Sequence, residues 1–363
     1  MDSLMLENAT PDFGEFERVI RGGIPERVHL VELLMDKEMM QDLVEGYLGR
    51  PWIPLVAGSE PAYYHQLVDL YYRLGYDCVN LVTDWLNQPD MAKVESAQRE
   101  SLPRGQKERG WVDEHRGIIA NWADYEAFPW DAVEPDYRAF ELIAASLPEG
   151  MKMTPMATVF THVHAGLLGT TDMLYLLYDN PDLVAAVFQR WGQLVYEFYA
   201  NLVDMDEVGA IWHADDLGFT TSTMVSPQFL RQHVLPWFAQ YAKLAHDHGK
   251  TFWLHCCGNV YVDGIIDDLI DDVGIDAFHS YQDPILSISE FQAQYGQRVA
   301  GMGGVDMDKL CRLDEKALRA YMRDILDHCM PQGRFAFGTG NTVTNYVPIE
   351  HYVWMIDEAR RWR

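Results

Sequence analysis

The segment T-F-W-L-H-C-C-G-N, residues 251–259, decides how the rest of the chain is read. Its apolar run ends abruptly in His255, Cys256 and Cys257, which is typical of a short buried strand that carries ligands at its carboxyl end. Side chains alternate along a strand, so His255 and Cys257 share one side and Cys256 faces the other. An imidazole and a thiolate on one side suit zinc. The alternative is a buried cysteine pair beside a core histidine.

Short apolar runs of this kind recur along the whole chain, and helical patterns separate them. The expected strands are residues 28–33, 77–82, 151–159, 209–213, 251–257, 276–280, 299–305 and 335–337. Eight strands that alternate with helices predict an α/β fold, a single (β/α)8 TIM barrel that spans residues 1–363. A doubly wound open sheet is the alternative, but no glycine-rich phosphate fingerprint follows the first strand.

Two segments fall outside this alternation. Residues 1–27 form an N-terminal extension with a short helix, whose apolar face carries Phe16, Val19 and Ile20. Residues 87–131 form a long, irregular and partly charged insertion after the second strand. A loop of this length inside a compact domain is usually functional, so we expect a lid.

Composition excludes several classes of protein. The net charge of -27 argues against a nucleic-acid partner and against binding to anionic membranes. No apolar run reaches the ~20 residues of a membrane helix, and the N-terminus lacks a basic-then-apolar signal pattern, so we expect a cytoplasmic protein. Five cysteines in 363 residues do not form a disulfide framework. The 48% hydrophobic content is sufficient for a large core.

Polar residues gather at the carboxyl ends of the expected strands, where the active site of such a barrel lies. In chain order they are Asp84 and Trp85, His162 and His164, Asp215 and Asp216 with Phe219 beyond, His255 and Cys257, His279, Asp306, and Asn341. For each acid the alternative is a cap of the following loop or helix. For each histidine it is a hydrogen-bonded core residue, and most of the aromatic residues are expected in the core. No G-x-S-x-G pattern appears, so a hydrolytic triad has no support.

Longer motifs carry a resemblance to a known superfamily. They are F-E-R-V-I-R-G-G-I-P-E-R-V (16–28), A-D-D-L-G-F (214–219), S-P-Q-F-L-R-Q-H-V-L-P (226–236), H-C-C-G-N-V (255–260), G-I-D-A-F-H-S (274–280), G-G-V-D (303–306) and G-T-G-N-T-V-T-N-Y-V-P (338–348). Together they resemble the uroporphyrinogen decarboxylase superfamily, which also includes the zinc-dependent corrinoid methyltransferases. The likeness covers nearly the whole chain and is specific for the superfamily, not for one reaction.

The resemblance divides between two branches. True decarboxylases carry an arginine-rich segment of the form R-Q-A-G-R near the N-terminus, and the matching region here reads E-L-L-M-D-K-E, although Asp84 falls near the family's tetrapyrrole-binding aspartate. The methyltransferase branch carries H-x-C on the fifth strand, matched by His255 and Cys257, and a further cysteine after the eighth strand. Thr339 stands at that last position. Asp216 or His279 is the expected replacement ligand, and Asp216 is favoured because carboxylates commonly bind zinc.

The resemblance therefore implies a zinc-dependent methyltransferase that moves a methyl group from a small methylated donor, such as a methoxylated aromatic, to a corrinoid cofactor or a corrinoid protein. Zinc would act as a Lewis acid. The expected catalytic residues are Asp84, Asp216 and His279, and the expected substrate-binding residues are Trp85, His162, His164, Asp215, Phe219 and Asn341. Thr339→Cys is expected to tighten zinc binding. A tetrapyrrole decarboxylase and a non-catalytic small-molecule-binding barrel are the alternatives.

Overall fold

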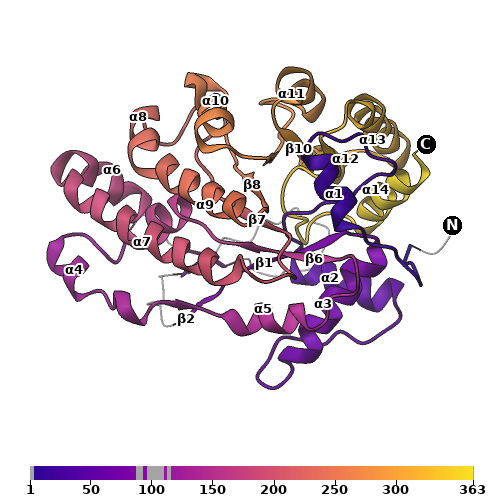
Figure 1. Ribbon diagram of the computed structural model, residues 1–363, viewed down its shortest axis with the longest axis horizontal. Helices are drawn as coiled ribbons and strands as arrows, with labels where there is room; N and C mark the ends of the chain where they lie inside the picture. Colours follow the sequence, from indigo (N-terminus) through magenta and orange to yellow (C-terminus); the bar gives the residue numbers. More distant parts are fainter. Residues whose placement is uncertain (1–3, 87–92, 96–109, 113–115, 363) are drawn as a thin grey trace.

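Parallel strands alternate with helices through the computed structural model, which describes residues 4–86, 93–95, 110–112 and 116–362 (Figure 1). One parallel sheet has the order β11-β10-β9-β8-β7, with β7 (Ala210–Ala214), β8 (Thr251–His255), β9 (Ala277–His279), β10 (Ala300–Val305) and β11 (Phe335–Thr339). A second parallel pair joins β1 (Cys78–Val82) to β6 (Lys152–Met156). The expected strands therefore pair side by side in the order in which the chain delivers them.

Three contacts close these two groups into a ring. A parallel bridge between Met153 and Val208 joins β6 to the segment that enters β7, and a bridge between Leu30 and Phe337 joins residues 28–33 to β11. On the other side of residues 28–33, the Asn80 amide of β1 donates to the backbone carbonyls of Glu32 and Leu33, each at 2.6 Å. The predicted TIM barrel is confirmed. The first expected strand forms a backbone bridge on one side only, because a side chain takes its carbonyls on the other.

Helices surround this ring. They are α1 (Phe13–Ile20), α2 (Lys37–Tyr47), α3 (Glu60–Leu74), α4 (Trp122–Ala127), α5 (Tyr137–Ala144), α6 (Thr170–Asp179), α7 (Pro181–Leu202), α8 (Pro227–Phe229), α9 (Leu235–Asp247), α10 (Ile265–Asp268), α11 (Ile288–Tyr295), α12 (Met307–Arg312), α13 (Glu315–Cys329) and α14 (Ile349–Arg361). A π-helical turn, Leu230–Val234, separates α8 from α9. It precedes Pro236, which has no N–H for a regular helical hydrogen bond. No described helix has both the length and the apolar character needed to cross a membrane.

The amino-terminal end of the barrel is filled by aromatic side chains. Trp212 and Trp253 are fully buried inside the ring, with their ring centroids 5.6 Å apart. Phe13 and Phe16 of α1 pack against Trp253, at 6.1 and 5.5 Å. Phe16 also stacks on His29 at the start of the first strand segment. The helix of the N-terminal extension thus closes this end, and the open end of the barrel is the one that carries the polar residues.

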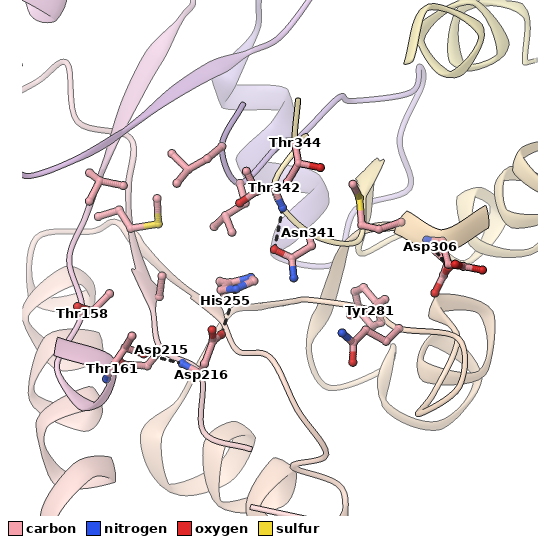
Figure 2. Close-up of a pocket in the computed structure, with 18 of the residues that line it drawn as sticks. Thr158, Thr161, Asp215, Asp216, His255, Tyr281, Asp306, Asn341, Thr342 and Thr344 are labelled. Atoms are coloured by element: carbon pink, nitrogen blue, oxygen red, sulfur yellow. Dashed lines mark hydrogen bonds and ion pairs between the residues drawn. The ribbon is translucent and has the colours of Figure 1, made fainter. Parts of the chain in front are cut away.

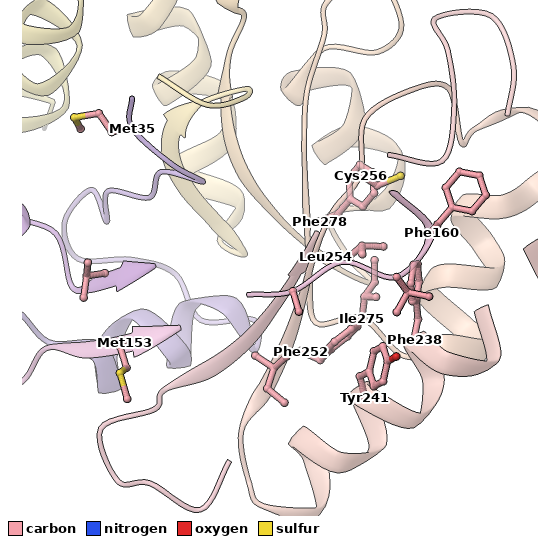
Figure 3. Packing of buried hydrophobic residues seen from close by; sticks show 14 of the residues in the cluster. Met35, Met153, Phe160, Phe238, Tyr241, Phe252, Leu254, Cys256, Ile275 and Phe278 are labelled. Carbon is pink, nitrogen blue, oxygen red and sulfur yellow. The ribbon is translucent and has the colours of Figure 1, made fainter. Parts of the chain in front are cut away.

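A second apolar layer lies between the strands and the outer helices. Figure 3 shows Phe252 and Leu254 of β8 on the side of the strand that faces Phe238 and Tyr241 of α9, and Cys256 belongs to the same apolar cluster. Cys256 is 1% exposed and lies in this layer, on the side of the segment opposite His255, as strand alternation predicts. Burial of its thiol in apolar surroundings raises its pKa well above the ordinary value, so Cys256 is a packing residue.

The described parts of the insertion contain short pieces of regular structure. β3 (Lys93–Glu95) pairs antiparallel with β4 (Gly110–Val112), and α4 (Trp122–Ala127) follows them. Just outside the insertion, at its two ends, β2 (Trp85–Leu86) pairs antiparallel with β5 (Glu134–Pro135). The remainder of the expected lid, residues 87–92, 96–109 and 113–115, lies outside the described residues. The lid, like the division of the chain into an extension and an insertion, stays a prediction.

Candidate metal centre

A cavity of about 760 Å³ opens at the carboxyl ends of the strands (Figure 2). Its wall combines apolar side chains such as Leu33, Leu34 and Met156 with polar groups from the strand ends. The charged residues of the wall are Asp215, Asp216, Asp306 and Asp308, together with the imidazole of His255. No lysine or arginine belongs to the wall within the described part of the chain.

Three potential metal ligands converge at one edge of this cavity. His255 Nε2 lies 3.4 Å from Cys257 Sγ and 3.5 Å from Asp216 Oδ1. All three ligand atoms lie within 4.8 Å of one another. Donors at zinc-ligand distances around a tetrahedral ion are separated by about 3.4–3.6 Å, so the separations from His255 Nε2 to Cys257 Sγ and to Asp216 Oδ1 match that geometry. The chemistry of the set, one imidazole, one thiolate and one carboxylate, is also that of a zinc site.

A tight turn at Gly258 holds Cys257 next to Asp216. His255 ends β8 beside Ala214 of β7, so the chain segments that follow these strands start as neighbours. Gly258, at φ +97°, turns the backbone against Gly218, and a Cβ at 258 would stand 2.2 Å from the Gly218 carbonyl carbon. The backbone N–H of Cys257 then donates to Asp216 Oδ1 at 3.1 Å. Only glycine permits both this φ angle and this close approach.

The electrostatics of the three residues favour a cation between them. Burial by itself would lower the pKa of His255, but the charge of Cys257 and hydrogen bonds to Asp216 and Cys257 raise it to about 10. Burial would raise the pKa of Asp216, but contacts with His255 and Cys257 lower it to about 2. The proton on His255 occupies the place that a divalent metal would take, since metal ligands bind in their deprotonated forms.

His279 and Thr339 lie directly behind His255. The Nδ1 atoms of His255 and His279 are 2.7 Å apart, and His279 Nε2 lies 2.9 Å from the Thr339 carbonyl oxygen. Both ring nitrogens of His279 are thus engaged, and the residue does not line the cavity. Burial, reinforced by the charge of His255, lowers the pKa of His279 well below its ordinary value. Its position suits support of His255 better than ligation.

Asn341 and Ser280 surround the sulfur of Cys257. Asn341 Nδ2 donates to Cys257 Sγ at 3.1 Å, while Asn341 Oδ1 accepts from the backbone N–H of Thr342. Ser280 Oγ lies 3.5 Å from the same sulfur. Asn341 lines the cavity, where a substrate-binding role was expected. Ser280 is not among the site residues expected from the sequence, although its position immediately after His279 at a strand end could have indicated it.

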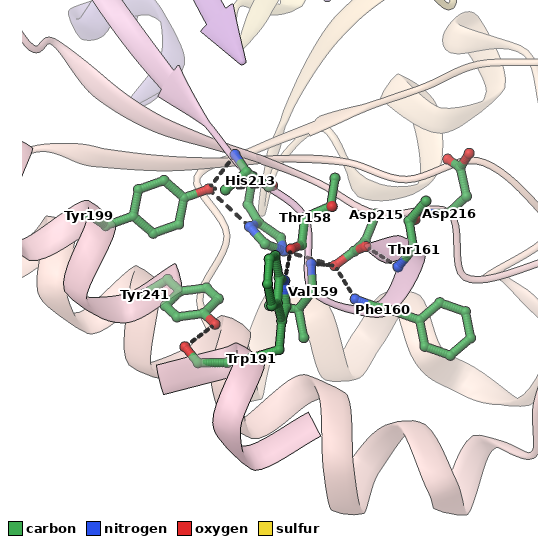
Figure 4. A network of polar contacts seen from close by, with 12 residues as sticks. Thr158, Val159, Phe160, Thr161, Trp191, Tyr199, His213, Asp215, Asp216 and Tyr241 are labelled. Atoms are coloured by element: carbon green, nitrogen blue, oxygen red, sulfur yellow. Dashed lines mark hydrogen bonds and ion pairs between the residues drawn. The ribbon is translucent and has the colours of Figure 1, made fainter. Parts of the chain in front are cut away.

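Asp215 borders the cavity but serves the backbone (Figure 4). Its carboxylate accepts hydrogen bonds from the N–H groups of Val159 and Phe160 at 2.9 Å and of Thr161 at 2.6 Å. His213 Nε2 lies 2.9 Å from the same carboxylate. Asp215 therefore fixes the turn after β6, and both of its oxygens are engaged within the protein. Asp306 acts similarly, since it caps α12 through two backbone N–H groups.

Comparison with known protein families assigns the chain to one of them. The family model of uroporphyrinogen decarboxylase (URO-D) matches residues 109–362. The chain belongs to the uroporphyrinogen decarboxylase family. The matched range contains all three potential metal ligands.

A solved structure shares the fold of this URO-D family member at low sequence identity, and two others align with low scores. A methyltransferase from Methanosarcina mazei aligns with a TM-score of 0.66 and 15% identity over 96% of this chain and 98% of that one. Dispersin B aligns at a TM-score of 0.34, 10% identity, and 64% and 78% of the two chains. A uronate isomerase from Bacillus halodurans aligns at 0.33, 9% identity, and 96% and 86%. No curated protein matches the chain.

Other expected site residues of this URO-D family member lie in packed layers. The imidazole of His162 stacks on Trp191, with centroids 3.8 Å apart and planes at 3°, and burial lowers the pKa of His162 to about 3. His164 is buried with Nδ1 2.9 Å from Thr170 Oγ1. Trp85 also packs against Trp191, and their ring centroids are 4.8 Å apart. None of His162, His164 and Trp85 lines the cavity.

Two further expected residues lie at the surface. Asp84 is exposed, and its backbone carbonyl accepts from the N–H of Asp136 at 2.7 Å. Phe219 is 56% exposed, and its backbone pairs with Ser222 and Asn259. Neither side chain belongs to the described wall of the cavity. The catalytic role expected for Asp84 and the substrate contact expected for Phe219 have no geometric support from this wall and stay predictions.

Proposed function

We propose that this URO-D family member is a cytoplasmic, zinc-dependent methyltransferase. It moves a methyl group from a small methylated donor, with methoxylated aromatics as the first candidates, to a corrinoid cofactor or a corrinoid protein. The observation that carries the proposal is the convergence of Asp216, His255 and Cys257 beside a cavity at the strand ends. The shared fold with a protein described as a methyltransferase supports it.

In this proposal each residue of the centre has a distinct task. His255, Cys257 and Asp216 would hold the metal, and three protein ligands are the number that catalytic zinc sites use. When bound, zinc supplies a Lewis acid for the atom that the methyl group leaves. The apolar wall residues Leu33 and Met156 contact the body of the donor and orient it.

The test follows methyl transfer directly. Purified protein is mixed with reduced cobalamin and a series of methoxylated aromatics, and formation of methylcobalamin is followed by its absorbance. Metal content is measured on the same samples. Zinc at about one equivalent together with methylcobalamin formation is the expected result. Wild-type protein that holds no zinc under metal-replete conditions would refute the Lewis-acid role.

A tetrapyrrole decarboxylase is the second candidate, and the cavity wall disfavours it. A substrate with many carboxylates needs several cationic groups for recognition. The described wall offers four aspartates and no lysine or arginine. We expect no conversion of uroporphyrinogen, and clear production of coproporphyrinogen would reverse the ranking. A non-catalytic binding barrel would be favoured if the protein neither bound metal nor used any methyl donor.

A further inference from the structure

Thr339, at the position of the family's further cysteine, forms polar contacts with three other residues. Its backbone N–H lies 3.3 Å from both carboxyl oxygens of Glu32, and its hydroxyl also contacts Glu32 Oε2. The same hydroxyl lies 2.5 Å from the Asn341 carbonyl oxygen. Its own carbonyl faces His279 Nε2. Thr339 is fully buried and is not part of the cavity wall.

Counting protons assigns the direction of these hydrogen bonds. A threonine hydroxyl has one proton, and a carbonyl oxygen can only accept. The Thr339 hydroxyl therefore donates to the Asn341 carbonyl, and the proton in its contact with Glu32 comes from Glu32. A neutral carboxyl is also what the surroundings favour, because burial raises the pKa of Glu32 to about 8. The Tyr76 hydroxyl, 3.3 Å from Glu32 Oε1, completes the set as a donor.

One arm from Thr339 reaches His255. Because the Thr339 carbonyl only accepts, the proton of the His279 ring sits on Nε2. The Nδ1 of that neutral ring then accepts the proton of His255 Nδ1 across 2.7 Å. His255 Nε2 is left to face Asp216 and Cys257. Such outer contacts set the orientation and the tautomer of a ligating histidine.

The other arm reaches Cys257. The backbone carbonyl of Asn341 accepts a hydrogen bond from the Thr339 hydroxyl. The side-chain Oδ1 of Asn341 accepts one from the backbone N–H of Thr342. This second contact fixes which end of the amide is which. The NH2 group therefore points at Cys257 Sγ, 3.1 Å away.

We propose that Thr339, held in place by a protonated Glu32, is a positioning residue that orients both His255 and Cys257 toward the metal. It fills the structural place of the family's cysteine without being a ligand. The inference deepens the proposed function and rests on its zinc centre.

The test compares variants at positions 339 and 32 by metal affinity and by the spectrum of the cobalt(II) form. Thr339→Val keeps the shape and removes the hydroxyl, and Thr339→Ser keeps the hydroxyl. Glu32→Gln supplies an N–H donor where the protonated acid supplied O–H. We expect Thr339→Val to weaken zinc binding by about 10- to 100-fold and to shift the sulfur-to-cobalt charge-transfer band. Thr339→Ser and Glu32→Gln should stay close to wild type in both measurements.

Two further variants keep the inference falsifiable if Thr339→Val folds poorly. Asn341→Ala, at the cavity wall, should shift the charge-transfer band by removing the donor to sulfur. Thr339→Cys should fail to tighten zinc binding. Tighter binding with added sulfur-to-cobalt absorption would identify position 339 as a ligand position and overturn the inference. So would Thr339→Val and Asn341→Ala proteins with wild-type affinity and spectrum. Wild-type protein that binds neither zinc nor cobalt would instead overturn the proposed function, and this inference with it.

Discussion

Polar residues stand at the carboxyl ends of β7, β8, β9 and β11 and also at those of β1 and β6. Among the residues that the structure describes, potential metal ligands converge in the first group alone. Asp216 and Cys257 meet there because the turn at Gly258 packs closely against the backbone of Gly218. After β6, the chain enters a π-helical turn, His162–Leu167, and His162 is laid flat on Trp191. A polar residue at a strand end is therefore not enough to make a site. The turn that follows decides whether the side chain faces the cavity or the helices.

The largest expected effect contrasts two adjacent thiols. Cys257→Ala should lose zinc binding by more than about 100-fold, since it removes a ligand and not merely an outer contact. Cys256→Ala should retain the metal, because its side chain lies in the outer apolar layer. Metal analysis after dialysis measures both. Zinc lost from the Cys256 variant and retained by the Cys257 variant would reverse the assignment.

Two acids of the same cavity wall give the next comparison. Asp216→Asn should weaken zinc binding by between about tenfold and 100-fold, because a neutral amide replaces a charged ligand. Asp308→Asn is the matched control, since Asp308 lines the same cavity but pairs with Arg312 at 2.8 Å. Titration of each protein with zinc against a chromophoric chelator separates them. Equal losses in the two variants would mean that general acidity of the wall, and not ligation, attracts the metal.

The positions of the strands and part of the candidate site follow from local patterns in the sequence. Apolar periodicity located the strands, and period-two alternation separated Cys256 from Cys257, because both follow from local backbone geometry. The resemblance to the family's motifs led to the prediction that Asp216 and His255 lie close together as metal ligands. Local pattern did not reveal the fate of His162, because the stacking partner of that ring lies on α7, in a different element of the chain.

Hydrogen bonds between buried polar residues far apart in the chain could not be predicted from the sequence either. Glu32 stands inside an apolar strand segment, which is a visible anomaly in the sequence, but its partner Thr339 lies 307 positions away. The expectation that Thr339→Cys would tighten zinc binding treated Thr339 as a substitute for a missing ligand. The contacts of its hydroxyl and carbonyl lead to the opposite expectation. Which role a residue has depends on its neighbours in space, and these are set by barrel closure.

A pH experiment sharpens the contrast on the β6 side. Burial lowers the folded-state pKa of His162 to about 3 from an ordinary value of 6.5. Between these values the unfolded chain binds the extra proton, so stability is present above pH 6.5 and is lost as the pH falls. His162→Phe, which keeps a ring on Trp191, should lack this loss. At pH 5.5 the free energy of unfolding of wild type relative to the variant should be about 1.4 kcal/mol lower than at pH 7.5. Urea unfolding at both pH values measures it, and parallel behaviour would contradict a neutral His162 in the folded protein.

The smallest effects are expected at the two exposed positions. Asp84→Asn and Phe219→Ala should each change the free energy of unfolding by less than about 0.5 kcal/mol, as is usual for surface substitutions. Zinc affinity should stay at the wild-type value in both, since neither residue belongs to the described cavity wall. A clear loss of methyl transfer in Asp84→Asn with unchanged zinc content would restore the catalytic role that the sequence suggested.

The opposite orientations of the adjacent thiols Cys256 and Cys257 also have a consequence for the oxidation of Cys257. Cys257 sits beside the cavity, while the sulfur of Cys256 is enclosed in an apolar layer on the other side of the chain. Neighbouring cysteines in this arrangement cannot close a disulfide with each other, so Cys256 is unable to rescue an oxidised Cys257. Sulfenic acid formed at Cys257 has to be trapped by a small thiol from solution, or it proceeds to the irreversible sulfinic state. A divalent metal bound at the proposed centre would protect the sulfur by occupying its lone pair, so oxidation of Cys257 is expected to be faster in metal-free protein than in zinc-loaded protein.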